Sequence, residues 1–432
     1  MSVRIRTMLQ ALTMTAAVAV SPLVAAPSAA GAVAPARSDS TVVTTWSAIA
    51  LRTVFTENAT PIPSSGLYLA LTSTAVFDAV VAIQGGYRPS VFSGRAPGHA
   101  SAEVAAATAA HRVLVQYFPA STPALDADYA TFLAGVPDGP ATAGGQQVGE
   151  ASAAAVIAAR VADGRGAAIT LDVAPAPGVW RPTPPLLAPM LVPWLGFVTP
   201  LALRSPEQIR LSGPRALASA GYARDFQEVK AYGAKIGSRR SDAQTETALF
   251  WNANAVLQYQ VALADHLRRH PTGLVQAARA FALLGVGTAD SLITCWRAKY
   301  DYATWRPITA IPLADTDGNP RTSPDPAWEP LVPTPPYPEY ASGHACITGA
   351  AADVFGYLFG QRSIDMNIAS SVTGTTRAFD STKALDTETQ NARIWLGLHF
   401  RRAMTDGNAI GHAASGWTIS HEFRPTCRGG HR

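Results

Sequence analysis

Residues 273–299 read GLVQAARAFALLGVGTADSLITCWRAK and indicate a long helix, because apolar side chains recur at helical spacing without a proline. Two proline-rich stretches, 174–200 and 311–340, are expected to be extended loops. No stretch alternates apolar and polar residues over enough positions to predict a sheet. The sequence therefore predicts an all-α protein of helical bundles with long Pro-rich loops. The same helical spacing predicts further helices over residues 66–83, 101–117, 141–163, 215–232, 242–252, 256–270, 346–359 and 388–395.

The composition is that of a globular protein with a large core. The chain has 432 residues, of which 48% are hydrophobic and 15% are charged. The 34 basic and 30 acidic residues give a formal net charge of +4, and no basic stripe carries interleaved aromatic residues. We therefore expect no nucleic-acid partner.

The N-terminus has the order of a secretory signal peptide. Arg4 and Arg6 precede a mostly apolar run over residues 8–26, and small residues follow as far as position 34. A single membrane anchor is the alternative, but Pro22 interrupts the run. No other segment looks long and apolar enough to span a membrane. We expect a secreted protein, with residues 1–34 removed and no stable membrane insertion afterwards.

The rest of the chain is most simply one helical domain. The alternative is a smaller N-terminal bundle that packs against a separate catalytic bundle, with the division between about residues 170 and 200. The expected segments are a flexible mature N-terminus over 35–44, a helical domain over 45–425 with its catalytic part over about 240–425, and a C-terminal tail over 426–432.

The three cysteines leave the disulfide question open. Cys295, Cys346 and Cys427 allow one disulfide and one free thiol in an exported protein, or buried thiols. Their spacing does not select a pair. No spacing of cysteine and histidine resembles a zinc site.

Polar and charged residues form three clusters in the C-terminal third. Lys299 and Arg306 are seven residues apart, close to two helical turns, so both can project from one face. Pro307 then places the Arg306 guanidinium at a helix end. The second cluster, Ser342-Gly343-His344, begins an apolar helix, where backbone N–H groups and the helix dipole attract an anion.

The third cluster is Arg393 with His399. Six residues apart on a straight helix, they would lie on divergent faces, but Gly397 offers a point where the chain can turn. Together the clusters supply three cations, a hydroxyl, a backbone N–H and two imidazoles. This set suits a multiply charged tetrahedral oxyanion, since arginine pairs with two oxygens at once and lysine acts as a point charge.

The order Lys-x6-Arg-Pro, Ser-Gly-His, Arg-x5-His resembles the signature shared by vanadium-dependent haloperoxidases and type 2 phosphatidic acid phosphatases. Further segments resemble the exported bacterial haloperoxidases: AVFDAVVAI (75–83), VWRPTPP (179–185), ALFWNANAVLQYQ (248–260) and ADSLITCWRAKYDYATWRPITAI (289–311). The resemblance covers about residues 45–425. It implies helical bundles of the haloperoxidase and acid phosphatase type.

The resemblance also implies roles. His399 would bond vanadium as the axial ligand of a vanadate cofactor, and His344 would be the acid–base group. Hydrogen peroxide and a halide would be the substrates, hypohalous acid the product, and Lys299 would polarise the peroxide. Trp296 and Tyr337 would line the halide side. The vanadate oxygens would be held by Lys299, Arg306, Ser342, Gly343 and Arg393.

A phosphatase is the alternative use of the same residues. Phosphate would occupy the vanadate position, His399 would form a phosphohistidine, and His344 would protonate the leaving alcohol of a small phosphate ester. A non-catalytic oxyanion-binding protein is a third possibility, but pure binding would not need two titratable histidines.

Two departures from the shared signature matter. Ala341 stands where a proline usually precedes Ser-Gly-His, which removes no chemical group. Ala403 stands where the phosphatases have an aspartate that orients the nucleophile. The loss of that carboxylate should harm a nucleophilic imidazole more than a metal-coordinating one, so it favours the peroxidase. Asp290 and Glu246 lie on other helices and are candidates to pair with Arg393, or else surface or capping charges.

Overall fold

The computed structural model describes residues 40–426, all within one compact unit. The expected signal peptide (1–34) and most of the expected C-terminal tail lie outside the described residues. A helix begins at Thr41, so residues 41–44 are not the flexible segment that was expected over 35–44. Val42, Val43 and Trp46 are buried against neighbouring helices, so hydrophobic contacts order this segment.

The predicted all-α class is confirmed. The sequence pattern did not predict α1, α4, α10 and α13. In α13, glycines lower the helix propensity, yet Gly407 and Gly411 lie where a Cβ would collide with α11. The α-helices within residues 40–426 are α1 (Thr41–Leu51), α2 (Ile62–Gln84), α3 (Ala102–Tyr117), α4 (Thr122–Ala134), α5 (Pro140–Ala159), α6 (Ala220–Tyr232), α7 (Asp242–Phe250), α8 (Ala255–Arg269), α9 (Leu274–Tyr302), α10 (Pro307–Ala310), α11 (Gly343–Phe359), α12 (Thr382–Trp395) and α13 (Arg401–His421).

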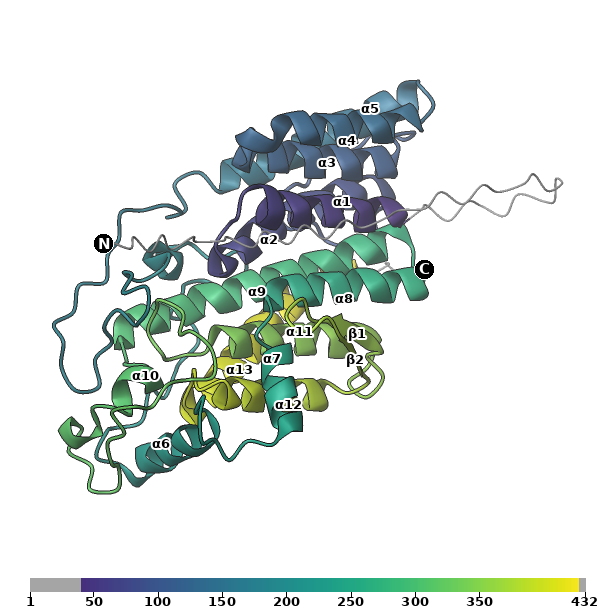
Figure 1. Ribbon diagram of the computed structural model, residues 1–432. Coiled ribbons are helices and arrows are strands. Elements are labelled where there is room, and N and C mark those ends of the chain that lie inside the picture. The colour runs from purple at the N-terminus through teal and green to yellow at the C-terminus, as the bar shows by residue number, and fades with distance from the viewer. Residues whose placement is uncertain (1–39, 427–432) are drawn as a thin grey trace, which may run out of the picture. The chain divides into compact units, whose positions relative to one another are not determined.

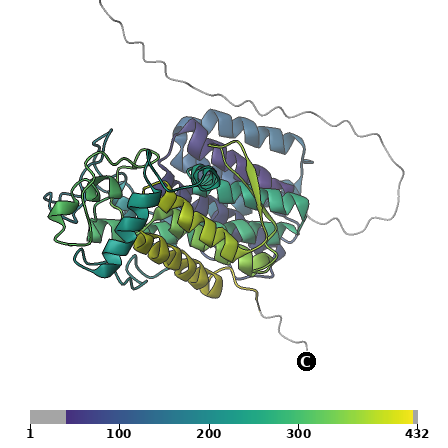
Figure 2. The ribbon, with the colours of Figure 1, turned by 60° about the horizontal axis from the view of Figure 1, so that its bottom comes forward.

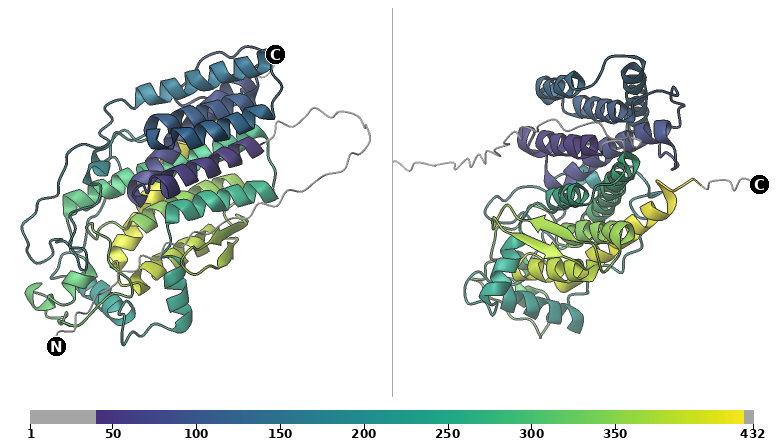
Figure 3. Two further views of the ribbon diagram at one scale, coloured as in Figure 1. Left: turned by 45° about the horizontal axis from the view of Figure 1, so that its top comes forward. Right: turned by 90° about the vertical axis from the view of Figure 1, so that its right-hand side faces the viewer.

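One short antiparallel hairpin accompanies the helices and was not expected. Strands β1 (Met366–Ala369) and β2 (Thr376–Phe379) pair Met366 with Phe379 at one end of the register. With four residues each, the strands are too short to produce a recognisable alternating pattern. The hairpin lies alongside α8 (Figure 3).

Helix α9 lies in the middle of the fold. Helices α1–α5 lie on one side of it, and α11 and α13 lie on the other (Figure 1). Glycines allow this close packing on both sides. A Cβ on Gly285 would lie 2.7 Å from Ser73 Oγ of α2, and a Cβ on Gly287 would lie 3.2 Å from Ser415 Cβ of α13.

Two helices meet the length and composition of a membrane span, which corrects the expectation that none would. They are α2 and α9, and the most apolar windows of these helices are 78% and 100% buried. Their apolar character therefore has a sufficient explanation in the core of the fold.

The two proline-rich stretches contain no α-helix and gather with α6 and α10 at one end of the helices (Figure 2). They touch each other there, since the Leu191 N–H donates to the Pro336 carbonyl at 2.8 Å. The stretch 311–340 then leads directly into α11. Its last residues border the C-terminal end of α9, where the first predicted cluster begins.

Candidate active site

The structure brings together the three predicted clusters from five different segments. The imidazole of His399 lies close enough to Lys299, Arg306 and Arg393 for their charges to affect it. All the cluster side chains are buried except that of His344, which is partly exposed. Their positions are Lys299 near the end of α9, Arg306 just before α10, Ser342, Gly343 and His344 at the start of α11, Arg393 near the end of α12, and His399 between α12 and α13.

Arg393 and His399 reach the same site because the chain turns at Gly397. This residue has a φ of +78°, a left-handed conformation that side chains with a Cβ disfavour. A Cβ there would lie 2.6 Å from the Gly233 carbonyl oxygen. The turn expected from the sequence is present.

Backbone carbonyls of the loop before α11 hold two of the cations. The Lys299 ammonium donates to the carbonyl oxygens of Pro338 at 2.8 Å and Glu339 at 3.2 Å. The Arg306 Nε donates to the Tyr337 carbonyl at 2.9 Å. Burial removes hydration from the Lys299 ammonium and lowers its pKa to about 8. The ammonium is thus fixed in place while part of its charge remains uncompensated.

Two guanidinium N–H groups of the site residues lie fully buried without a hydrogen-bond partner. They are Nη2 of Arg306 and Nε of Arg393. Burial lowers the pKa of Arg393 to about 10, and the nearby Arg306 charge acts in the same direction. Unpaired buried donors are costly. Together with the Lys299 ammonium, whose charge acts on Arg306 and His399, these donors fit a tetrahedral oxyanion such as vanadate or phosphate.

The aromatic pair lies against the same cations. The rings of Trp296 and Tyr337 are 5.0 Å apart between centroids, and the Lys299 ammonium lies 4.9 Å from the Tyr337 ring. Gly343 packs on the indole, since a Cβ would lie 3.1 Å from the Trp296 ring. The aromatic rings therefore form one wall of the cationic site.

The buried carboxylate of Glu339 is the site residue that sequence analysis missed. Its Oε1 lies 3.0 Å from Nδ1 of His399. Burial raises the pKa of Glu339 to about 7, although Arg306 and Lys299 oppose the shift. Burial also holds the pKa of His399 well below its ordinary value, and the neighbouring cations add to that effect. The only sequence signal was the position of Glu339, three residues before Ser342.

Ala403 therefore does not leave His399 without a carboxylate, and the interpretation that it favours a peroxidase is wrong. His399 does have a carboxylate partner, supplied by the loop before α11 rather than by the helix that follows His399. Asp406, the carboxylate nearest in sequence, instead accepts the Tyr340 hydroxyl at 2.6 Å. The missing aspartate consequently gives no reason to prefer a peroxidase over a phosphatase.

Neither carboxylate considered as a partner for Arg393 contacts it. Asp290 is buried and accepts the backbone N–H groups of Leu201, Ala202 and Leu203 at 2.7–2.8 Å. Glu246 pairs with Arg377 instead. The partner of Arg393 is the Trp251 carbonyl, which accepts from Nη1 at 3.0 Å.

His344 occupies the accessible side of the site. Its Nε2 lies 3.1 Å from the Ala253 carbonyl oxygen, which accepts only an N–H, so the other nitrogen carries the lone pair. Burial of the ring and the charge of Arg393 lower its pKa well below the ordinary value. At neutral pH, His344 is thus an uncharged base at the edge of a cationic site.

The part of the chain that carries these clusters is similar to known proteins. A sequence model of the second helical-bundle domain of vanadium chloroperoxidase (VCPO) matches residues 279–425, which include all three clusters. Vanadium chloroperoxidase of Curvularia inaequalis is 29% identical over 171 residues. The C-terminal part of the chain is therefore similar to vanadium haloperoxidases. The aligned part spans 29% of this chain and only 27% of the Curvularia protein.

The fold of the vanadium haloperoxidases extends over most of the chain. A bacterial vanadium-dependent iodoperoxidase matches 92% of this chain and 100% of its own, with a TM-score of 0.79 and 21% identity. A holo-type bacterial vanadium-dependent chloroperoxidase matches 83% of this chain and 91% of its own, with a TM-score of 0.66 and 17% identity. The shared architecture therefore includes helices well before residue 279.

Two cysteines lie next to this site. Cys295 and Cys346 are buried free thiols, and Cys427 lies outside the described residues. The Cys295 thiol donates to the Ala341 carbonyl at 3.4 Å. Of the alternatives left open by the sequence, the structure shows buried thiols for this pair.

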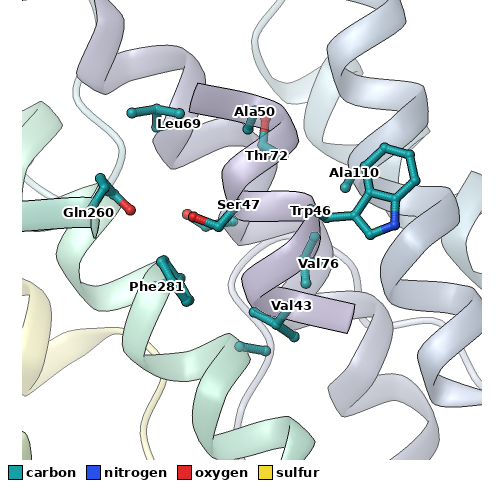
Figure 4. A pocket seen from close by; sticks show the side chains of 12 residues that line it. Val43, Trp46, Ser47, Ala50, Leu69, Thr72, Val76, Ala110, Gln260 and Phe281 are labelled. Carbon is teal, nitrogen blue, oxygen red and sulfur yellow. The ribbon is translucent and has the colours of Figure 1, made fainter. Parts of the chain in front are cut away.

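Two further features of the described structure lie outside this site. Figure 4 shows a cavity of about 30 Å³, lined mainly by apolar side chains such as Val43, Val76 and Phe281, with Gln260 among its few polar ones. His266, His270 and Asp365 lie close enough to share a cation, but the Arg269 guanidinium already pairs with that carboxylate. We assign neither of them to the chemistry.

Proposed function

We propose that this protein is a vanadate-dependent haloperoxidase that oxidises a halide with hydrogen peroxide to hypohalous acid. The main support is the buried site in which unpaired N–H groups of Arg306 and Arg393 lie close to the imidazole of His399. The similarity of residues 279–425 to the second helical-bundle domain of vanadium chloroperoxidase supports the same function.

Vanadate would lie where the three cations converge, with His399 as the ligand of its vanadium. When bound, it supplies a Lewis acid that activates hydrogen peroxide without itself changing oxidation state. The donors that would bind its oxygens are Lys299, Arg306, Ser342, the Gly343 N–H and Arg393.

Lys299 has a donor left for the peroxide. An ammonium has three N–H groups, and two of them donate to the carbonyls of Pro338 and Glu339. The third is free to hydrogen-bond a peroxide oxygen and make it more electrophilic. The fixed position of the ammonium means that little reorganisation accompanies this contact.

His344 would handle the protons. The net reaction consumes one hydrogen peroxide, one halide and one proton, and yields hypohalous acid and water. Because His344 is uncharged and partly exposed, it accepts a proton when peroxide binds and returns one as the product forms. In the same proposal, Trp296 and Tyr337 line the side from which the halide approaches.

The test is a paired assay on one preparation. Protein stripped of bound anions is given orthovanadate and assayed for peroxide-dependent halogenation of a phenol dye with chloride, bromide and iodide. Hydrolysis of a phosphate ester is measured in parallel. We expect halogenation that requires vanadate and peroxide. Brisk hydrolysis without halogenation between mildly acidic and neutral pH would overturn the proposal.

A phosphatase is the second candidate, favoured by one observation. The contact of Glu339 with His399 supplies the carboxylate that a nucleophilic imidazole uses. His399 Nε2 would attack phosphorus and expel the alkoxide, which takes a proton that His344 has first accepted from solvent. Water would then release phosphate from His399. Protein denatured in alkali, in which phosphohistidine is stable, and carrying labelled phosphate on His399 would establish this route.

A further inference from the structure

The carboxylate of Glu339 makes two hydrogen bonds with one oxygen. Its Oε1 accepts the backbone N–H of Phe400 at 2.9 Å and lies 3.0 Å from Nδ1 of His399. A backbone N–H can only donate, so Oε1 acts as the acceptor here. The Arg306 guanidinium, which can only donate, lies 3.1 Å from the other ring nitrogen, Nε2, so Nε2 is the acceptor and Nδ1 carries the proton shared with Oε1.

This hydrogen bond determines the direction of the free lone pair of His399. With the proton on Nδ1, the lone pair of the neutral ring is on Nε2. Nε2 lies 3.1 Å from Nη1 of Arg306, inside the cationic site. The opposite tautomer would turn an N–H toward Arg306, where two donors would oppose each other.

Glu339 itself is held firmly in place. Its backbone N–H donates to the Thr304 carbonyl at 3.0 Å, and its own carbonyl accepts the Lys299 ammonium. Only 3% of the residue is exposed. One residue thus fixes Lys299 through its main chain and His399 through its side chain.

We propose that Glu339 is a positioning residue that commits His399 to the Nδ1–H tautomer and so presents the Nε2 lone pair to the bound oxyanion. This inference rests on the proposed function, because it takes the bound oxyanion to be vanadate. It extends that function, because it assigns oxyanion affinity to a loop residue outside the three clusters.

Two variants separate the hydrogen bond from the charge. Glu339→Gln keeps a carbonyl oxygen that can accept from both the Phe400 N–H and His399 Nδ1–H. Glu339→Ala removes the acceptor altogether. Glu329→Ala is the matched control, since Glu329 lies in the same loop but is exposed and paired only with exposed Lys235.

The first readout is the vanadate dissociation constant, measured by equilibrium dialysis. We expect Glu339→Ala to bind about 10- to 100-fold more weakly, the usual effect of losing the partner of a ligating histidine. Glu339→Gln should lose less vanadate affinity than Glu339→Ala, and Glu329→Ala should bind vanadate as tightly as the wild type. Wild-type affinity in a folded Glu339→Ala protein would overturn the inference.

The second readout is the tautomer itself, from ¹⁵N spectra of histidine-labelled protein with the His399 signal assigned by His399→Gln. We expect the Nδ1–H form in the wild type and in Glu339→Gln. If Glu339→Ala does not fold, this comparison still decides, because an Nε2–H signal in the wild type would overturn the inference. If the wild-type protein binds vanadate no better than His399→Ala, the proposed function is overturned. The tautomer measurement does not depend on vanadate, so it still tests the role of Glu339.

Discussion

Two histidines at either end of one short stretch of chain lie in opposite electrostatic surroundings. His399, just before α13, is buried beside three cations, and its pKa lies well below the ordinary value. His412, within α13, lies between Asp353 at 2.9 Å and Asp386 at 3.0 Å, which raise its pKa to about 10 although burial opposes the shift. The same side chain is a neutral base with a free lone pair in one place and a structural cation in the other.

The difference shows how the fold assigns a task to each imidazole. Asp353 comes from α11 and Asp386 from α12, so the His412 imidazolium joins three helices that surround the site. His399 has one carboxylate and several competing cations, so its ring stays uncharged and available to a ligand. A set of variants can test each side of this contrast.

The largest expected effect is that of His399→Ala on oxyanion binding. Removal of the ligand nitrogen should weaken vanadate binding by more than about 100-fold, beyond the loss expected for a residue that only positions it. The measurement is equilibrium dialysis together with peroxide-dependent halogenation. A His399→Ala protein that kept full affinity and activity would disprove the site assignment.

His412→Gln should have the opposite profile. Two carboxylates would lose the cation between them, which costs about 1–3 kcal/mol of unfolding free energy once the partial exposure of the group is discounted. Urea denaturation measures that loss. Vanadate affinity of the folded variant should remain unchanged, and a large loss of affinity would mean that the two histidines are not independent.

A smaller effect is expected from pH on the His412 cluster. Because the folded-state pKa is raised above its unfolded value near 6.5, the stabilisation is complete below that pH and is lost as pH rises toward about 10. The difference in unfolding free energy between wild type and His412→Gln should therefore shrink between pH 7 and pH 10. A difference that grew with pH would show that His412 is uncharged in the folded protein.

Much of the fold could be predicted from local patterns. Apolar spacing predicted α2, α3, α5, α8 and α9, and the proline-rich stretches were correctly excluded from α-helices. Helix α13 was not predicted because its glycines disfavour a helix in isolation. Their close contact with α11 exists only when the two helices are packed together. The hairpin was not predicted because its strands are too short to show an alternating pattern of apolar and polar residues.

By itself, the sequence determined the chemistry that the site can offer. The site residues could be predicted because their types, order and spacing are properties of the chain alone, as is the turn available at Gly397. They are Lys299, Arg306, Ser342, Gly343, His344, Arg393 and His399. Only the tertiary structure decided which carboxylate serves which histidine. Hydrogen bonds depend on distances across the fold, so Glu339 rather than a residue near position 403 reaches His399. The pKa values of His399 and His412 diverge for the same reason, since burial and neighbouring charge exist only in the folded chain.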